Sequence, residues 1–203
     1  MTQGNLSLKG ELGIQKITPP GPPLAWRIKN FPNWWRGYWR LQLQKAVARI
    51  TSLPFYFGTL ELTLIKADGR RINFGPVSYR VVTSAFVNAA AANMVNNATS
   101  PVIDSYDYHD CGTGTTAEAS ADTTLVTAFG GSRSSGTASN PSSNVYRSVG
   151  TITFSGTFAV TEHGLFSAST SGTLLDRSVF SAVNVVSGDS IQFTYSLTLT
   201  AGG

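Results

Sequence analysis

Two histidines and a single cysteine are the residues of this chain best suited to metal binding or nucleophilic catalysis. His109 and Cys111 lie two residues apart in a segment with several aspartates, and His163 is the only other histidine. Structural zinc sites use four ligands, so these three residues and one carboxylate would just suffice. However, no CxxC or HExxH spacing accompanies them, and no general base is placed by the sequence beside a nucleophile. We therefore predict no metal site, no cofactor and no catalytic residue, and we expect a protein that is not an enzyme.

A second candidate for chemistry is the glycine-rich stretch Gly112–Thr116, GTGTT. Phosphate-binding loops of the GxxxxGK[ST] type need a lysine at a fixed spacing, because its ammonium group reaches the phosphates. This stretch has neither the spacing nor the lysine, so it predicts a tight turn.

All four tryptophans of the chain lie in residues 26–40, where cations are interleaved with them. Trp, Tyr and Arg dominate the energetics of protein interfaces, and aromatic rings beside cations also suit stacking on bases. We predict that this segment anchors the protein to a partner, with packing on the protein's own sheet as the alternative. The predicted partner-binding residues are Trp26, Arg27, Phe31, Trp34, Trp35, Arg36, Tyr38, Trp39 and Arg40.

Charge is distributed unevenly along the chain. Residues 1–80 hold 12 Lys and Arg against 3 acidic residues, a net +9, whereas residues 81–203 hold 3 Arg against 8 acidic residues, a net −5. Such an asymmetry suggests two surfaces with different partners. A weak contact with nucleic acid through the basic first part is therefore possible.

The strand pattern predicts a mainly β protein. Charged residues make up only 13% of the chain, about half of the usual ~25%, and short strands and turns suit such a composition. Apolar residues alternate with polar ones over 190–200 and 60–64, Asp68-Gly69 predicts a hairpin turn, and 41–47 also suggest a strand. One short helix is expected over 84–96, where Ser84 can cap an Ala-rich run. The expected fold is an antiparallel β-sandwich, similar to a jelly roll, with at most this one short helix.

The N-terminal part is expected to lie outside that sandwich. Residues 19–23, PPGPP, favour an extended polyproline conformation. We predict an extended N-terminal arm over residues 1–40, containing this strap and the Trp-rich anchor, and a sandwich domain over 41–203. Within the domain, residues 100–147 are expected to form a loop-rich insertion.

The C-terminal half resembles a module in structural proteins of tailed bacteriophages. The resemblance rests on five short motifs in order: YHDCGTGTTAE (108–118), DTTL (122–125), VTEHGLF (160–166), LLDRSVF (174–180) and GDSIQFTY (188–195). It implies a β-sandwich component of a virion without enzymatic activity.

The expected function is therefore that of a phage virion structural protein, either a head cement or minor capsid protein or a head–tail accessory subunit. Its expected partners are other virion proteins, such as major capsid, portal or tail subunits, and further copies of itself in a homo-oligomer. No signal peptide and no run of 18 apolar residues is found, so we expect no membrane partner and assembly in a host cytoplasm. The alternatives are a receptor- or glycan-binding domain of a tail fibre and a jelly-roll major capsid protein.

Overall fold

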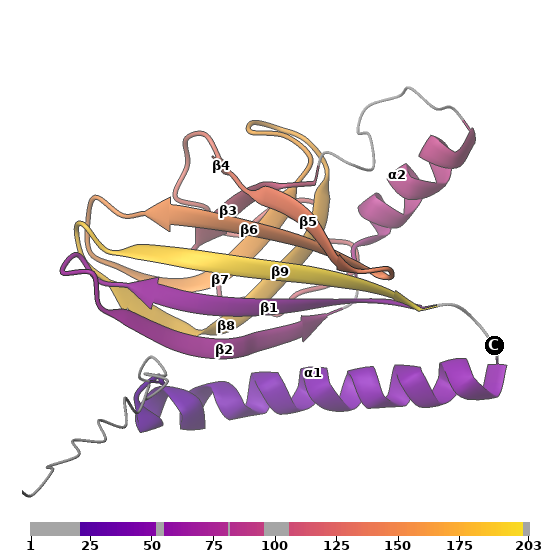
Figure 1. Ribbon diagram of the computed structural model, residues 1–203, viewed down its shortest axis with the longest axis horizontal. Coiled ribbons are helices and arrows are strands. Elements are labelled where there is room, and N and C mark those ends of the chain that lie inside the picture. Colours follow the sequence, from indigo (N-terminus) through magenta and orange to yellow (C-terminus); the bar gives the residue numbers. More distant parts are fainter. Residues whose placement is uncertain (1–20, 52–54, 81, 96–105, 201–203) are drawn as a thin grey trace, which may run out of the picture.

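Two antiparallel sheets face each other in the computed structural model, which describes residues 21–51, 55–80, 82–95 and 106–200 (Figure 1). Sheet A has the strand order β2-β1-β9-β6-β5, and sheet B has the order β4-β3-β7-β8. The mainly β, antiparallel sandwich predicted from the sequence is confirmed. The elements in chain order are α1 (Leu24–Thr51), β1 (Phe55–Ile65), β2 (Arg71–Arg80), α2 (Ser84–Val95), β3 (Tyr108–Gly112), β4 (Ser134–Ser135), β5 (Thr137–Ser142), β6 (Val145–Thr153), β7 (Phe158–Phe166), β8 (Leu174–Val185) and β9 (Ser190–Thr200).

The core lies between the two sheets. Along β9 the apolar side chains from Ile191 to Leu197 are buried, while the polar residues between them are only partly covered. Leu60, Leu62 and Leu64 of the neighbouring β1 point to the same side and are buried with them. The period-2 pattern thus predicted both strands correctly, because each strand buries one face and leaves the other to solvent.

The turn between β1 and β2 is the one expected from Asp68-Gly69. The amide of Gly69 donates to the carbonyl oxygen of Lys66 at 2.8 Å, and the φ of Gly69 is +84°, a conformation that favours glycine. The hairpin brings β2 to the edge of sheet A.

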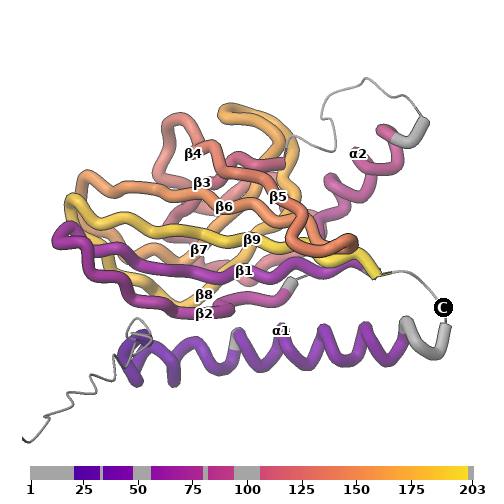
Figure 2. The backbone as a smooth tube through the Cα atoms, viewed as in Figure 1, coloured from indigo at the N-terminus to yellow at the C-terminus, as the bar shows by residue number. Residues whose placement is uncertain are grey.

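Helix α1 covers one side of the sandwich, running beside β2 and β8 (Figures 1 and 2). These are the edge strands of the two sheets on that side. Exposed edge strands carry unpaired backbone groups that promote aggregation, and covering them with a helix is a common solution. The helix is therefore part of the sandwich's own packing.

This helix corrects three predictions. Residues 24–40 are helical, so they are not an extended arm; residues 41–51 continue the same helix, so they do not form a strand. With 28 residues in α1, the limit of one short helix was also wrong. Pro32 lies inside the helix and argued against it, since proline removes a helical hydrogen bond. The contacts of α1 with the sandwich outweigh the cost of Pro32. Residues 1–20 of the predicted arm lie outside the described residues.

The stretch predicted as a loop-rich insertion, 100–147, contains regular strands. β3 pairs with β7 in sheet B, and β5 pairs with β6 in sheet A, so this stretch adds strands to both sheets. The low-complexity composition of 130–144 hid β4 and β5, because all six side chains of β5 are exposed and carry no apolar alternation. The predicted helix over 84–96 is confirmed as α2, and Thr83, not Ser84, caps it by accepting from the amide of Phe86 at 3.1 Å.

Within the described parts of the chain, neither helix has the length and apolar character needed to cross a membrane.

Candidate functional site on helix α1

The inward face of α1 satisfies backbone groups at the edge of sheet B. The indole nitrogen of Trp26 donates to the carbonyl oxygen of Ser181 at 2.9 Å, and the amide of Ser181 donates to the side-chain oxygen of Asn30 at 3.0 Å. Trp26 also packs edge-on against Phe74 of β2, with ring centroids 4.7 Å apart. Asn30 is buried, and its amide nitrogen lies 3.4 Å from the carbonyl oxygen of Val77 in β2. Two side chains one helical turn apart therefore connect α1 to both edge strands.

Replacing Asn30 by alanine should lower the free energy of unfolding by roughly 1–2 kcal/mol, because it leaves the partly buried amide of Ser181 without its acceptor. Urea unfolding measures the loss, and hydrogen exchange at Ser181 should accelerate with it. Asn88→Ala, on the exposed side of α2, is the matched control and should change stability by less than ~0.5 kcal/mol. An Asn30 variant as stable as the control would show that this bridge contributes nothing.

Two further aromatic residues of the predicted anchor also contact the chain's own sandwich. The rings of Trp34 and Tyr38 stack at 5.2 Å, and both pack edge-on against Tyr79 of β2. Gly37 lies between them and is buried; a Cβ there would come within 2.8 Å of the carbonyl oxygen of Tyr79. The glycine thus allows the helix backbone to approach β2 closely.

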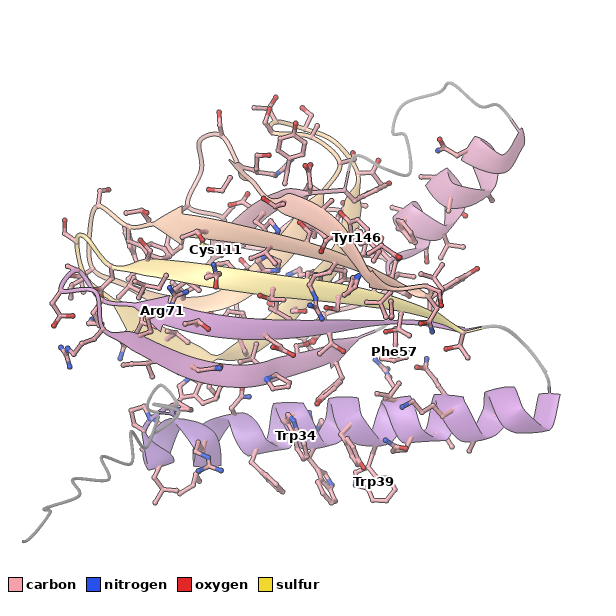
Figure 3. All side chains as sticks on the ribbon, in the orientation of Figure 1. Trp34, Trp39, Phe57, Arg71, Cys111 and Tyr146 are labelled. Carbon is pink, nitrogen blue, oxygen red and sulfur yellow. The ribbon has the colours of Figure 1, made fainter. Side chains whose placement is uncertain are left out.

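The other six predicted partner-binding residues are exposed to solvent: Arg27, Phe31, Trp35, Arg36, Trp39 and Arg40. Figure 3 shows Trp39 on the side of the helix that points away from the sheets. The alternative of packing on the protein's own sheet thus holds for Trp26, Trp34 and Tyr38. A partner-binding role stays a prediction for the six exposed residues.

Three of these residues, Phe31, Trp35 and Trp39, belong to a longer apolar surface that we call the outer face. It consists of Leu24, Ile28, Phe31, Trp35, Trp39 and Leu43, which are 44–70% exposed. Their spacing of three or four residues places them along one side of the helix. The ring of Trp35 lies 5.5 Å from those of both Phe31 and Trp39, so the aromatic part is a continuous row. Six large apolar side chains in one row are more than isolated surface residues, and such patches mark interaction sites.

Cations border the outer face. Arg27, Lys29, Arg36 and Arg40 are exposed, and the sequence of α1 contains no acidic residue. In the described part of the chain, no carboxylate forms an ion pair with these four side chains. The helix therefore presents an apolar row with positive margins to solvent.

A groove of about 970 Å³ opens where the N-terminal half of α1 meets the β2 strand. Its lining includes Trp26, Phe31, Trp34, Asn73 and Phe74. Because Phe31 belongs to the outer face and Trp26 to the inward face, the groove extends the outer face toward the sandwich. A side chain of a docked partner could enter it.

The histidines and the cysteine that suggested a metal site do come together, on the inner face of sheet B. His109 Nδ1 lies 3.0 Å from His163 Nε2, and His109 Nε2 lies 2.8 Å from the hydroxyl of Ser148. Cys111 stands directly opposite His163 in the pairing of β3 with β7. Both histidines and the cysteine are buried, and a Cβ on Gly150 would lie 2.4 Å from the His109 ring, so glycine makes room for it.

The environment of these groups keeps them neutral. Burial lowers the pKa of His109 to about 4. Burial, and then the proximity of His109, lower the pKa of His163 well below its usual value. Burial raises the pKa of the Cys111 thiol, and the carboxylates of Asp110 and Glu162 raise it further. A thiol held in its protonated form is a poor nucleophile and a poor metal ligand, and the described residues contain no group of three or more His, Cys, Asp and Glu that could hold a metal ion.

A buried ion pair lies on the opposite face of sheet B. Glu162 of β7 accepts from the Nε of Arg177 at 2.8 Å and from the amides of Gly114, Val126 and Thr127 at 3.0, 3.1 and 2.7 Å. Both charged side chains are at most 1% exposed. A Cβ on Gly114 would come within 2.5 Å of a Glu162 oxygen, so this close approach needs a glycine. The tight turn predicted at 112–116 is wrong: Gly112 is the last residue of β3, and residues 113–115 follow it without a turn. The cluster fastens the segment between β3 and β4 to the sheet.

These contacts also account for the acidic second part of the chain. Of the eight acidic residues in 81–203, Glu162, Asp176 and Asp189 are buried, and Asp110 and Asp122 form ion pairs with Arg133 and Arg177. Asp104 lies outside the described residues. Most described carboxylates of this part are therefore used inside the fold, and they do not form an acidic surface.

No family model matches the sequence, and no curated protein and no solved structure matches it either. The chain is a mainly β, two-sheet sandwich whose most prominent exposed feature is the outer face of α1.

Sequence reasoning found the aromatic part of this site and missed its ends. Leu24, Ile28 and Leu43 continue the row at helical spacing, but the predictions of an extended arm over 1–40 and of a strand over 41–47 concealed that periodicity. Asn30 carries no signal of its own, because a bridging amide depends on two strands that are distant in sequence.

Proposed function

We propose that this protein is a non-enzymatic structural subunit of a virion, held in the particle by the outer face of α1 docked on a neighbouring virion protein. The observation that carries the proposal is the row of exposed apolar side chains bordered by arginine and lysine. Aromatic residues and arginine are the residues most enriched at the energetic centres of protein interfaces.

Two further features support it. The motifs of the C-terminal half resemble a module of tailed-phage structural proteins, and four of the five fall wholly or partly on β3, β7, β8 and β9, which contribute to the core of the sandwich. α1 is fixed to this sandwich by Trp26 and Asn30. A rigidly mounted helix loses little conformational entropy on docking, which favours binding.

A triple substitution, Phe31→Ser, Trp35→Ser and Trp39→Ser, tests the proposal. All three side chains point outward, so the variant should fold with a melting temperature close to that of the wild type, yet its copy number in purified particles should fall at least tenfold. Quantitative mass spectrometry against the major shell protein measures the copy number.

The matched control is Val126→Ser with Val186→Ser, two exposed apolar side chains that lie far from α1 in the sequence. It should enter particles normally. Normal incorporation of the triple variant would refute the role of the outer face, and absence of the wild-type protein from particles would refute the virion assignment.

A further inference from the structure

The outer face changes direction along the helix, and this restricts the shape of what can cover it. An α-helix turns about 100° per residue, so Leu24 and Trp35 point in nearly the same direction. Phe31 and Leu43 are twelve residues apart and therefore point about 120° apart. A flat surface such as a lipid bilayer, laid on the middle of the face, would leave both of these side chains at its margins. A concave surface that follows the helix contacts both.

The margins of the face are positive on both sides. By the same angular arithmetic, Arg27 borders one side, and Lys29, Arg36 and Arg40 border the other. Lys45 points toward the sandwich instead, with its ammonium 5.4 Å from the centroid of the Phe57 ring in β1. Docked cations lose hydration and need negative charge opposite them. The covering surface is therefore expected to carry acidic groups along both rims.

The described residues of a second copy of this chain do not supply such a surface to α1. Two α1 helices packed together would bring cations against cations, because α1 has no acidic residue. Elsewhere in a second copy, five of the carboxylates of 81–203 are buried or paired with arginine, as described above. Like charges brought together at an interface are a strong obstacle to association.

Single-stranded nucleic acid supplies negative charge but does not fit the row of rings. Binding by stacking needs open ring faces. Phe31 stacks on Trp35 with an interplanar angle of 24°, and Trp39 meets Trp35 edge-on at 74°. The ends of the row are aliphatic, at Leu24, Ile28 and Leu43, and offer bases nothing to stack on.

We propose that the outer face of α1 binds an apolar groove with acidic rims on a different polypeptide. This inference rests on the proposed function in one respect: both take the outer face as the docking surface. This chain has a groove of its own beside Trp26 and Phe74, and a side chain of the partner would enter it. That contact would fix where the partner sits along α1.

Site-specific photo-crosslinking in cells that make the full-length protein tests the inference. The photoreactive amino acid p-benzoylphenylalanine is placed at Ile28 or at Leu43, on outward positions near the two ends of the face. Both positions should crosslink to one and the same polypeptide, different from this chain, with the crosslinked peptides near Asp or Glu residues. The same group at Val126 is the control and should give no such product.

Charge reversal then tests the acidic rims. Arg36→Glu with Arg40→Glu should reduce the yield of the crosslinked product at least tenfold, while Arg36→Lys with Arg40→Lys should largely retain it. Lysine substitutions at the crosslinked carboxylates of the partner should restore the product with the charge-reversed chain. Both arginines are exposed, so these variants should fold normally.

Four results would overturn the inference: crosslinks to a second copy, adducts with lipid or nucleic acid, no crosslinked product, or a yield that ignores charge reversal. The outcome is separate from that of the virion proposal. A charge-dependent partner in cells that make no particles containing this protein would uphold the acidic groove and refute the virion assignment.

Discussion

Glu162→Gln should lower the free energy of unfolding by about 3–5 kcal/mol, the usual cost of breaking a buried ion pair on one side. The substitution leaves the guanidinium of Arg177 buried, with Asp122 as its remaining carboxylate partner. It also removes negative charge from a site that three backbone amides point to. The free energy of unfolding of native proteins is only about 5–15 kcal/mol, so this loss is a large fraction of the total stability.

The pKa of Glu162 shows which influence is stronger at this site. Burial acts to raise it, but the amide of Thr127 and the guanidinium of Arg177 outweigh burial and hold the pKa below its usual value. The carboxylate is therefore charged at neutral pH, and a neutral amide of nearly the same size tests the charge itself.

Urea unfolding with Glu61→Gln as the matched control measures the effect. Glu61 lies on the exposed face of β1, and its variant should differ from the wild type by less than ~0.5 kcal/mol. Hydrogen exchange at Gly114, Val126 and Thr127 should accelerate in the Glu162 variant. A loss below ~1 kcal/mol would mean that desolvation of the two charges nearly cancels their attraction.

The sequence predicted the elements that depend on a local pattern and missed those that depend on contacts between distant residues. Along β9 the period-2 alternation is the direct consequence of one buried face, so local pattern was enough. Helix α1 depends on residues that are distant in the sequence. The carbonyl oxygen of Ser181 accepts from Trp26, and its amide donates to Asn30. Tyr79 lies against Trp34, Gly37 and Tyr38. The aromatic composition of α1 and Pro32 pointed away from a helix, and tertiary packing overrode them.

The polar clusters follow the same rule. The sequence places His109 and Cys111 two residues apart, but only the pairing of β3 with β7 places His163 opposite Cys111. Glu162 and Arg177 gave no signal, because their contact depends on how β7 pairs with β8. The carboxylate of Glu162, which the glycines at 112 and 114 accommodate, could not be foreseen, because it lies about fifty residues away in the sequence.

Acidification from pH 7 to pH 5 should destabilise the protein strongly, because the two buried histidines are neutral in the folded state. An exposed histidine in the unfolded chain has a pKa near 6.5, whereas burial lowers that of His109 to about 4. Between these values the unfolded chain binds a proton that the folded one excludes, so stability falls with pH by up to about 1.4 kcal/mol per pH unit for each histidine. His109 alone accounts for a loss of roughly 3 kcal/mol by pH 4. His163 adds to it in the same direction.

The geometry explains why a proton is excluded. A single hydrogen between His109 Nδ1 and His163 Nε2 satisfies both ring nitrogens, and the Ser148 hydroxyl satisfies the other nitrogen of His109. The ring of His163 also lies against Phe193, with centroids 4.4 Å apart, so a positive charge would meet apolar surroundings in place of water. Charging either ring therefore favours the unfolded chain.

Urea unfolding at pH 7, 6 and 5 measures this dependence in a pH range in which most carboxylates do not titrate. Glu162 and Asp189 have lowered pKa values, so their contribution to stability is lost only below the usual carboxylate range near 4. His109→Asn removes one titrating ring and keeps an amide near the place of His109 Nδ1, where it can bond to the ring of His163, so it should roughly halve the slope between pH 7 and pH 5. A flat profile in the wild type would show that the histidine pair takes up a proton without loss of the fold. A steep profile that His109→Asn leaves unchanged would assign the acid sensitivity to other groups, and NMR titration of both imidazole rings would identify which of them binds the proton.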